Sequence, residues 1–165
     1  MSFKTAIQKL ESWPQFKQFK AKNKKAFLFS AFFILNSSLE IESQQLDYFI
    51  GKNKVVTFVI NDTIEQKKDI ISPNTKLTSL NKNIKVDLDK VKKIIEREIN
   101  ERFLTEFKLS KVFVVLQKIG NVQLWNVTCL MSDLKILRLH IDCFNSKILE
   151  AKEESLVDFM SFQKK

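Results

Sequence analysis

A histidine and an aspartate two residues apart are the residues in this chain best suited to acid–base chemistry. His140 and Asp142 alternate with apolar residues, so an extended strand places both side chains on one face. A carboxylate beside an imidazole can orient a general base. No nucleophile stands at a matching spacing, and strand alternation alone produces a polar face. We therefore interpret these residues as a polar sheet surface, and we predict no catalytic residues and no enzyme activity.

The sequence also contains few residues that could bind a metal ion or a cofactor. The chain has one histidine, two cysteines and two glycines, and the glycines lie far apart in the sequence. Phosphate-cradling loops need two or three glycines close together, and a four-Cys zinc site needs more cysteines. Asp87 and Asp89 fall at the expected start of a helix, where carboxylates complement the helix dipole. We predict no metal site, no cofactor, and two reduced cysteines buried in the core at Cys129 and Cys143.

Basic charge is concentrated at the start of the chain. The 165 residues carry a formal net charge of +9, and residues 1–25 hold seven lysines and one glutamate. Aromatic residues at positions 13, 16 and 19 recur among these lysines, and such a mixture can stack on bases or lie at a membrane surface. Helical spacing favours the other interpretation, in which the aromatic rings face the core and the lysines face water. The candidate residues for binding a polyanion are Lys17, Lys20, Lys22, Lys24 and Lys25.

The longest apolar run covers residues 26–35. As a helix it would span about 15 Å, which is half of a bilayer core, so it predicts no transmembrane segment. The region before it is too long for a secretory signal, and no small-residue cleavage site follows. A strand buried on both faces explains the run. With no signal predicted, we expect a cytoplasmic location.

The elements that would position these residues follow from hydrophobic periodicity. We predict a helix over residues 3–25, interrupted at Pro14, and a second helix over 87–107 with Asp87 as its N-cap. Residues 62–86 show no clear period and are predicted to be a connector. Residues 151–162 are predicted to form a terminal helix, and 147–150 a short extra strand. The predicted strands cover residues 26–36, 39–50, 54–61, 111–119, 122–131 and 135–144.

The last three strands allow a register to be predicted. A two-residue Gly120-Asn121 turn joins the first pair, and a three-residue turn joins the second. This register puts Val114, Val127 and Leu139 side by side on one apolar face. A slip of one residue would expose that whole set. The opposite face then carries the candidate interaction residues Asn126, Thr128, Arg138 and His140.

The segment from Asp87 to Glu150 resembles a PepSY-type module. The similarity rests on the amphipathic helix, the Trp125-Asn-Val strand and the closing hairpin LRLHIDCFNSKILEAKEE. Asp142 holds the family's aspartate position, whereas Asn145-Ser146-Lys147 stands where the family has a turn glycine. The resemblance implies a small non-catalytic α+β domain of a kind that is often extracytoplasmic and associated with proteases or membrane proteins. It implies no binding residues.

Together these observations predict an α+β fold. We expect two halves, each a helix plus a three-stranded antiparallel meander, as a pseudo-repeat with the helices packed on one sheet face. The halves are residues 1–62 and 87–165 with a connector at 63–86, or else one continuous domain over 1–165. The predicted function is a non-enzymatic binding or scaffolding module for a protein partner. The alternative is binding of RNA, DNA or an anionic membrane surface through the basic N-terminal region.

Overall fold

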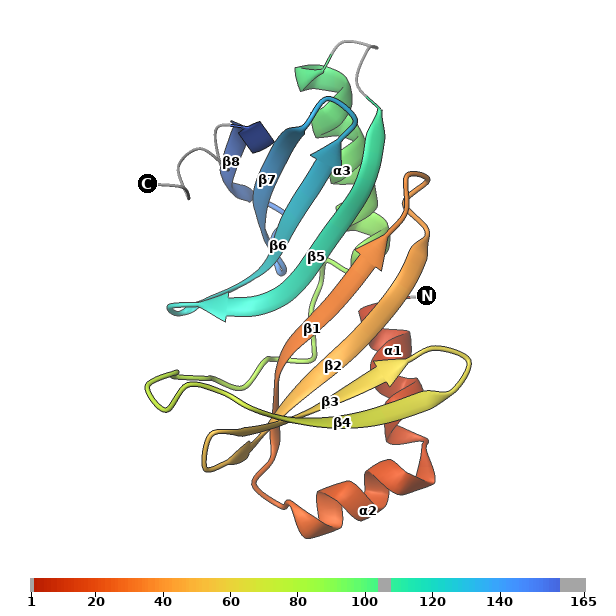
Figure 1. The fold of residues 1–165 in the computed structure, drawn as a ribbon, viewed down its shortest axis with the longest axis vertical. Helices are drawn as coiled ribbons and strands as arrows, with labels where there is room; N and C mark the ends of the chain where they lie inside the picture. The colour runs from red at the N-terminus through yellow and green to blue at the C-terminus, as the bar shows by residue number, and fades with distance from the viewer. Residues whose placement is uncertain (1, 104–107, 158–165) are drawn as a thin grey trace.

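The computed structural model describes residues 2–103 and 108–157 and has a single eight-stranded antiparallel sheet at its centre (Figure 1). The strand order is β4-β3-β2-β1-β5-β6-β7-β8, so two meanders meet where β1 pairs with β5. The helices are α1 (Phe3–Glu11), α2 (Pro14–Lys22) and α3 (Leu88–Arg102). The strands are β1 (Phe27–Leu35), β2 (Ile41–Gly51), β3 (Lys54–Ile60), β4 (Ile64–Ile70), β5 (Leu109–Ile119), β6 (Val122–Met131), β7 (Lys135–Asp142) and β8 (Ile148–Ser155).

The predicted division into two three-stranded halves is wrong. Each meander has four strands, and all eight strands belong to one sheet. The two strands that the sequence did not predict in full are the sheet edges. β4 lies inside the segment predicted to be a connector, and β8 extends the predicted short strand 147–150 through residues 151–155 of the predicted terminal helix. Residues 158–162 of that helix lie outside the described residues.

Both edge strands are polar because they have one neighbour and little to cover. Six of the seven β4 residues are exposed, and the strand is held by backbone pairing with β3. Charged edge strands protect an open sheet against pairing with another chain. Such strands lack the apolar alternation that makes a strand visible in a sequence.

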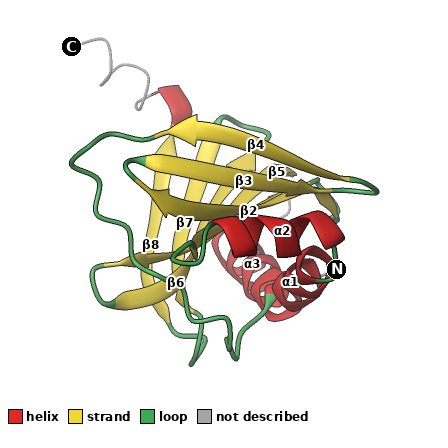
Figure 2. Cartoon of the chain, turned by 90° about the horizontal axis from the view of Figure 1, so that it is seen from below, coloured by secondary structure: helices red, strands yellow, loops and turns green. Residues whose placement is uncertain are grey.

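The three helices lie together on one side of the sheet (Figure 2). Alternate strand residues face them and are buried, as in β5, where Val112, Val114 and Leu116 are fully buried. One cluster of buried residues draws on α1, α3 and both meanders. Within the described ranges, no helix combines the length and the apolar character needed to cross a bilayer.

Trp125 of β6 lies where the two meanders and two helices meet. Its ring is fully buried and packs edge-on against Phe3 of α1, with centroids 6.4 Å apart. It also packs at a tilt against Phe33 of β1, with centroids 6.0 Å apart. Its indole N–H donates to the carbonyl of Val86, 2.7 Å away, just before α3. This one side chain therefore links α1, β1, β6 and the start of α3.

Asp87 caps two helices at once. One of its carboxylate oxygens accepts from the backbone N–H of Leu88, the first residue of α3, at 2.7 Å. The carboxylate also accepts from Phe3 and Lys4, the first residues of α1, at 2.8 and 3.2 Å. The predicted capping role is confirmed, and the long-range contact adds to it. The positive ends of both helix dipoles thus meet at one negative charge.

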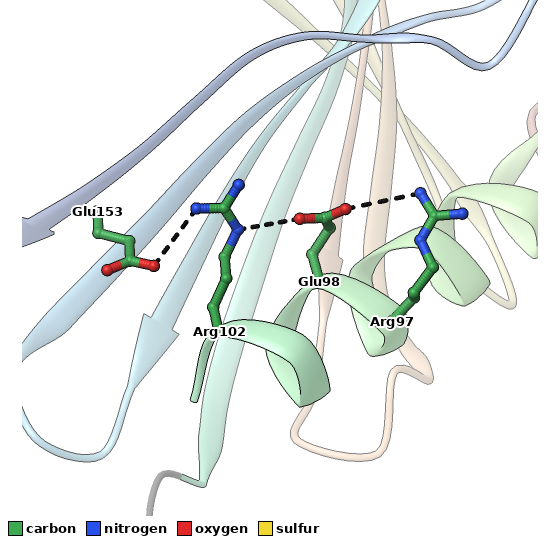
Figure 3. A network of polar contacts seen from close by, with 4 residues as sticks. All are labelled: Arg97, Glu98, Arg102 and Glu153. Carbon is green, nitrogen blue, oxygen red and sulfur yellow. Dashed lines mark hydrogen bonds and ion pairs between the residues drawn. The ribbon is translucent and has the colours of Figure 1, made fainter. Parts of the chain in front are cut away.

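A chain of ion pairs fastens the far end of α3 to the edge strand β8 (Figure 3). Glu98, which is 7% exposed, pairs with Arg97 at 3.6 Å and with Arg102 at 2.9 Å. Arg102 reaches on to Glu153 of β8 at 3.4 Å. Hydrogen bonding to Glu98 raises the pKa of Arg102 above its ordinary value, so the guanidinium stays charged. The network holds α3 over the last strands of the sheet.

Candidate binding face

The side of the sheet that faces away from the helices, here called the outer face, carries an apolar strip at its centre. Phe32 and Ile34 of β1 lie beside Val115 and Phe113 of β5, their cross-strand partners. The rings of Phe32 and Phe113 are stacked, with centroids 6.2 Å apart and planes 12° from parallel. All four side chains are half-buried and lie outside the core cluster. We define the apolar strip as these four residues.

The four residues predicted to form an interaction surface lie together on the outer face. Asn126 of β6 is opposite His140 of β7, and Thr128 is opposite Arg138. The predicted register of both hairpins is confirmed, since Val114 pairs with Val127 and Val127 with Leu139. The polar cluster borders the apolar strip directly, because Asn126 is also opposite Val115 of β5, and Thr128 is opposite Phe113.

The edge strand β8 supplies ion-pair partners that the sequence analysis missed. His140 Nδ1 lies 3.3 Å from Glu150 Oε2, and Arg138 Nε lies 3.6 Å from Glu154 Oε2. Lys152 completes the row by pairing with Glu150 at 3.1 Å. The signal was the two-residue spacing of Glu150, Lys152 and Glu154, which is the period of a strand. Because residues 151–162 were predicted to form a helix, this strand-like spacing was not recognised.

A hollow of about 190 Å³ lies among these charged side chains, Arg138, His140, Glu150, Lys152 and Glu154. Each of them is between 24% and 61% exposed, so the hollow is open to water. The other partner considered for the imidazole, Asp142, is engaged elsewhere. Its carboxylate accepts from the backbone N–H groups of Phe144 and Asn145 and shapes the β7–β8 turn. The arrangement is a water-exposed row of positive and negative side chains along β7 and β8.

On the other side of the apolar strip, Asp47 of β2 is a half-buried carboxylate on the outer face. It lies opposite Ser30 of β1 and Thr57 of β3 and accepts a hydrogen bond from the Thr57 hydroxyl. Loss of hydration on burial raises the pKa of Asp47 above its ordinary value, although hydrogen bonds from Thr57, Gln45 and Ser30 oppose the rise. Folding therefore disfavours the charged carboxylate of Asp47 relative to its protonated form.

Asp47→Asn is expected to stabilise the chain at neutral pH. A raised carboxyl pKa means that folding favours the protonated form, so the native carboxylate costs stability once the pH has risen through the folded pKa. The amide keeps an oxygen that can accept from Thr57. Urea unfolding at neutral pH should show a higher midpoint for the variant, with the difference shrinking toward zero in acid. A lower midpoint at neutral pH would contradict this assignment.

The lysines predicted to bind a polyanion occupy α2 and the segment that follows it. Lys17, Lys22, Lys24 and Lys25 are exposed, whereas Lys20 is half-buried and donates to the carbonyl of Ala26 at 2.9 Å. The aromatic residues between them face inward. The rings of Phe16 and Phe19 lie 5.5 and 5.0 Å from the Phe58 ring, and the Trp13 ring lies 6.3 Å from it. Phe16 and Phe19 are buried, so bases cannot stack on these two rings, whereas Trp13 is half-buried.

The two cysteines are free and buried, as predicted. Burial raises the pKa of the Cys129 thiol to about 12 and of the Cys143 thiol to about 11, so neither is a ready nucleophile. In residues 2–103 and 108–157, no group of three or more His, Cys, Asp or Glu side chains is arranged to hold a metal ion.

One solved structure has a similar fold. It is the crystal structure of a putative lipoprotein from Clostridium difficile 630, with a TM-score of 0.55 and 14% sequence identity. The alignment covers 85% of this chain and 90% of that one. No family model matches the chain, and no curated protein matches it in sequence. At this identity the likeness establishes the fold alone, and the PepSY-type resemblance stays a prediction.

Proposed function

We propose that this chain is a non-enzymatic binding module that docks a protein partner on the outer face of its sheet. The observation that carries the proposal is the composition of that face. The apolar strip lies at the centre, and the polar cluster Asn126, Thr128, Arg138 and His140 borders it. An apolar centre with a polar, hydrogen-bonding border is the arrangement of protein–protein interfaces.

The partner that fits this face is a protein surface with an apolar centre and charged groups beside it. Arg138 and His140 already have carboxylate neighbours in Glu154 and Glu150, so a partner can exchange with these ion pairs as well as add to them. The stacked Phe32 and Phe113 rings supply apolar area that folding leaves partly in contact with water. Burial of that area on docking supplies the driving force.

The cellular setting is a proposal too. The sequence predicts the cytoplasm, whereas the similar Clostridium difficile protein is described as a putative lipoprotein, which favours an anchored position at a membrane. Fractionation of cells that carry a tagged full-length chain separates the two. A signal in the cytosolic fraction supports the first setting, and one in the membrane fraction supports the second.

Capture experiments with surface variants test the function directly. The immobilised chain should retain a partner from a lysate of its own cells. A variant with Asn126, Thr128, Arg138 and His140 all changed to alanine should retain at least about tenfold less, because it removes four contact side chains at once and a tenfold loss needs only about 1.4 kcal/mol in total. Lys93→Ala with Glu101→Ala, on the exposed side of α3, is the matched control and should retain the partner as the native chain does.

Loss of binding must be separated from loss of folding. All variants should therefore unfold in urea at midpoints close to that of the native chain. If the fourfold alanine variant is folded and still captures every protein that the native chain captures, the outer face is not the docking surface.

A further inference from the structure

The two ends of the sheet differ in charge. At one end lie the segment before β1, the β2–β3 turn, the β5–β6 turn and the stretch 71–80. Their residues include Lys24, Lys25, Lys52 and Lys76, with no acidic residue among them; the β7–β8 turn at the same end adds Lys147, beside Asp142 at the end of β7. At the opposite end the β1–β2, β3–β4 and β6–β7 turns carry Glu40, Asp62 and Asp133, and the residue before β5 is Lys108. We call the first the basic end and define it by Lys24, Lys25, Lys52 and Lys76, all of them exposed.

The basic end is held together by the stretch 71–80, which crosses it. The backbone N–H of Ile71 donates to the carbonyl of Asn53 in the β2–β3 turn, 2.8 Å away. The N–H of Leu80 donates to the carbonyl of Leu28 at the start of β1, also at 2.8 Å. Asn81 and Gln123, beside the β5–β6 turn, exchange two hydrogen bonds of 2.8 and 2.9 Å. Figure 1 shows these segments along the left and lower left of the molecule.

Exposed aliphatic side chains accompany the lysines at this end. Ile70, the last residue of β4, is 74% exposed, and Ile119 and Val122, which flank the β5–β6 turn, are 45% and 40% exposed. These are three of the seven large apolar side chains exposed in the described part of the chain. Lys54, the cross-strand partner of Ile70, and Lys118, next to Ile119, add two more exposed cations, and Asp69, next to Ile70, adds one exposed anion.

We propose that the basic end docks on the surface of an anionic lipid bilayer. Lysines near such a surface gain from its negative potential, and aliphatic side chains beside them gain by entering the boundary between headgroups and acyl chains. Ile119 and Val122 are cross-strand partners beside the β5–β6 turn, and neither belongs to the buried core cluster. The four lysines that define the basic end lie in turns and loop segments, whereas the outer face is formed by strand residues.

Charge and side-chain chemistry favour a bilayer over a nucleic acid. Arginine makes the bidentate contacts that phosphates and bases select, and all three arginines of the chain pair with glutamates away from the basic end. The aromatic rings among the N-terminal lysines are packed against Phe58. Aliphatic side chains at turn tips complement acyl chains, whereas they have no partner in a phosphate backbone.

Sedimentation with vesicles tests the proposal on the full chain. Vesicles in which about a third of the lipid is phosphatidylserine should bind the chain at about 0.1 M salt, and vesicles of phosphatidylcholine alone should not. The variant K24Q/K25Q/K52Q should bind the anionic vesicles at least about tenfold more weakly. The matched control, K67Q/K93Q/K108Q, removes the same charge from exposed lysines outside the basic end and should change binding no more than about twofold.

A second variant separates a bilayer from other polyanions. Ile119→Ser with Val122→Ser keeps every charge and should weaken vesicle binding about fivefold or more, through the lost burial of two exposed side chains. Binding of a mixed-sequence oligonucleotide, measured in parallel by fluorescence polarisation, should be weak and removed by physiological salt. The proposal is overturned if both lysine variants weaken vesicle binding equally. It is also overturned if the aliphatic variant binds vesicles normally while the oligonucleotide binds tightly.

Discussion

Changing Trp125 to alanine is expected to lower the free energy of unfolding by about 3–5 kcal/mol, the largest loss from any single substitution considered for this chain. The ring is fully buried against Phe3 and Phe33, so its removal leaves a cavity between α1 and β1. It also leaves the carbonyl of Val86 without its indole donor. Urea unfolding followed by circular dichroism measures the loss.

Two companion variants keep this prediction testable. Trp125→Phe retains an aromatic ring but no N–H donor, and it should cost about 2 kcal/mol, enough to measure even if the alanine variant does not fold. Asn126→Ala, the next residue on the same strand, lies on the outer face and should change stability by less than about 1 kcal/mol. A loss below about 1 kcal/mol for both Trp125 variants would show that the junction does not hold the meanders together.

The second large effect is expected at Asp87. Asp87→Ala removes the acceptor for three backbone N–H groups, one in α3 and two in α1, and should cost about 2–3 kcal/mol. Replacing an N-cap normally costs about 1 kcal/mol because one helix is affected, whereas here two helices lose a partner. Urea unfolding gives the magnitude, and amide hydrogen exchange shows whether α1 and α3 both lose protection.

Asp89→Ala is the matched control, since it removes the same charge two residues further along the same helix. Asp89 is exposed and only complements the dipole, so its loss should cost at most about 1 kcal/mol. Asp87→Asn keeps one acceptor oxygen and should lie between the two. If Asp87→Ala and Asp89→Ala lower the free energy of unfolding equally, Asp87 stabilises the helices only through its charge.

The elements that could be predicted were those with one clean apolar period. The helix stripe beginning at Leu88 and the two hairpins after it were correctly placed, although the helix ends at Arg102 and not at the predicted residue 107. The hairpin register agrees pair by pair. A one-residue slip would have moved Trp125 from the core to water. Because such a slip costs so much free energy, the register could be predicted from the sequence. The edge strands β4 and β8 carried no such penalty, because either face of a polar edge strand tolerates water.

The candidate site was predictable in its residues and not in its surroundings. Asn126, Thr128, Arg138 and His140 share a face because strand alternation requires it. The apolar strip beside them depends on the pairing of β1 with β5, two strands separated by more than seventy residues of sequence, and no local pattern reveals that contact. Glu150 fell in the predicted short strand 147–150, whereas Glu153 and Glu154 fell in the segment wrongly predicted to be a helix.

The most direct test of the central claim is site-specific crosslinking from the apolar strip. A photoreactive phenylalanine analogue placed at Phe113 should form a covalent adduct with the captured protein partner, and the same analogue at Lys93 on the exposed side of α3 should form none. That pair of results would place the partner on the outer face. An adduct from position 93, with none from position 113, would place the partner on the helical side and contradict the account.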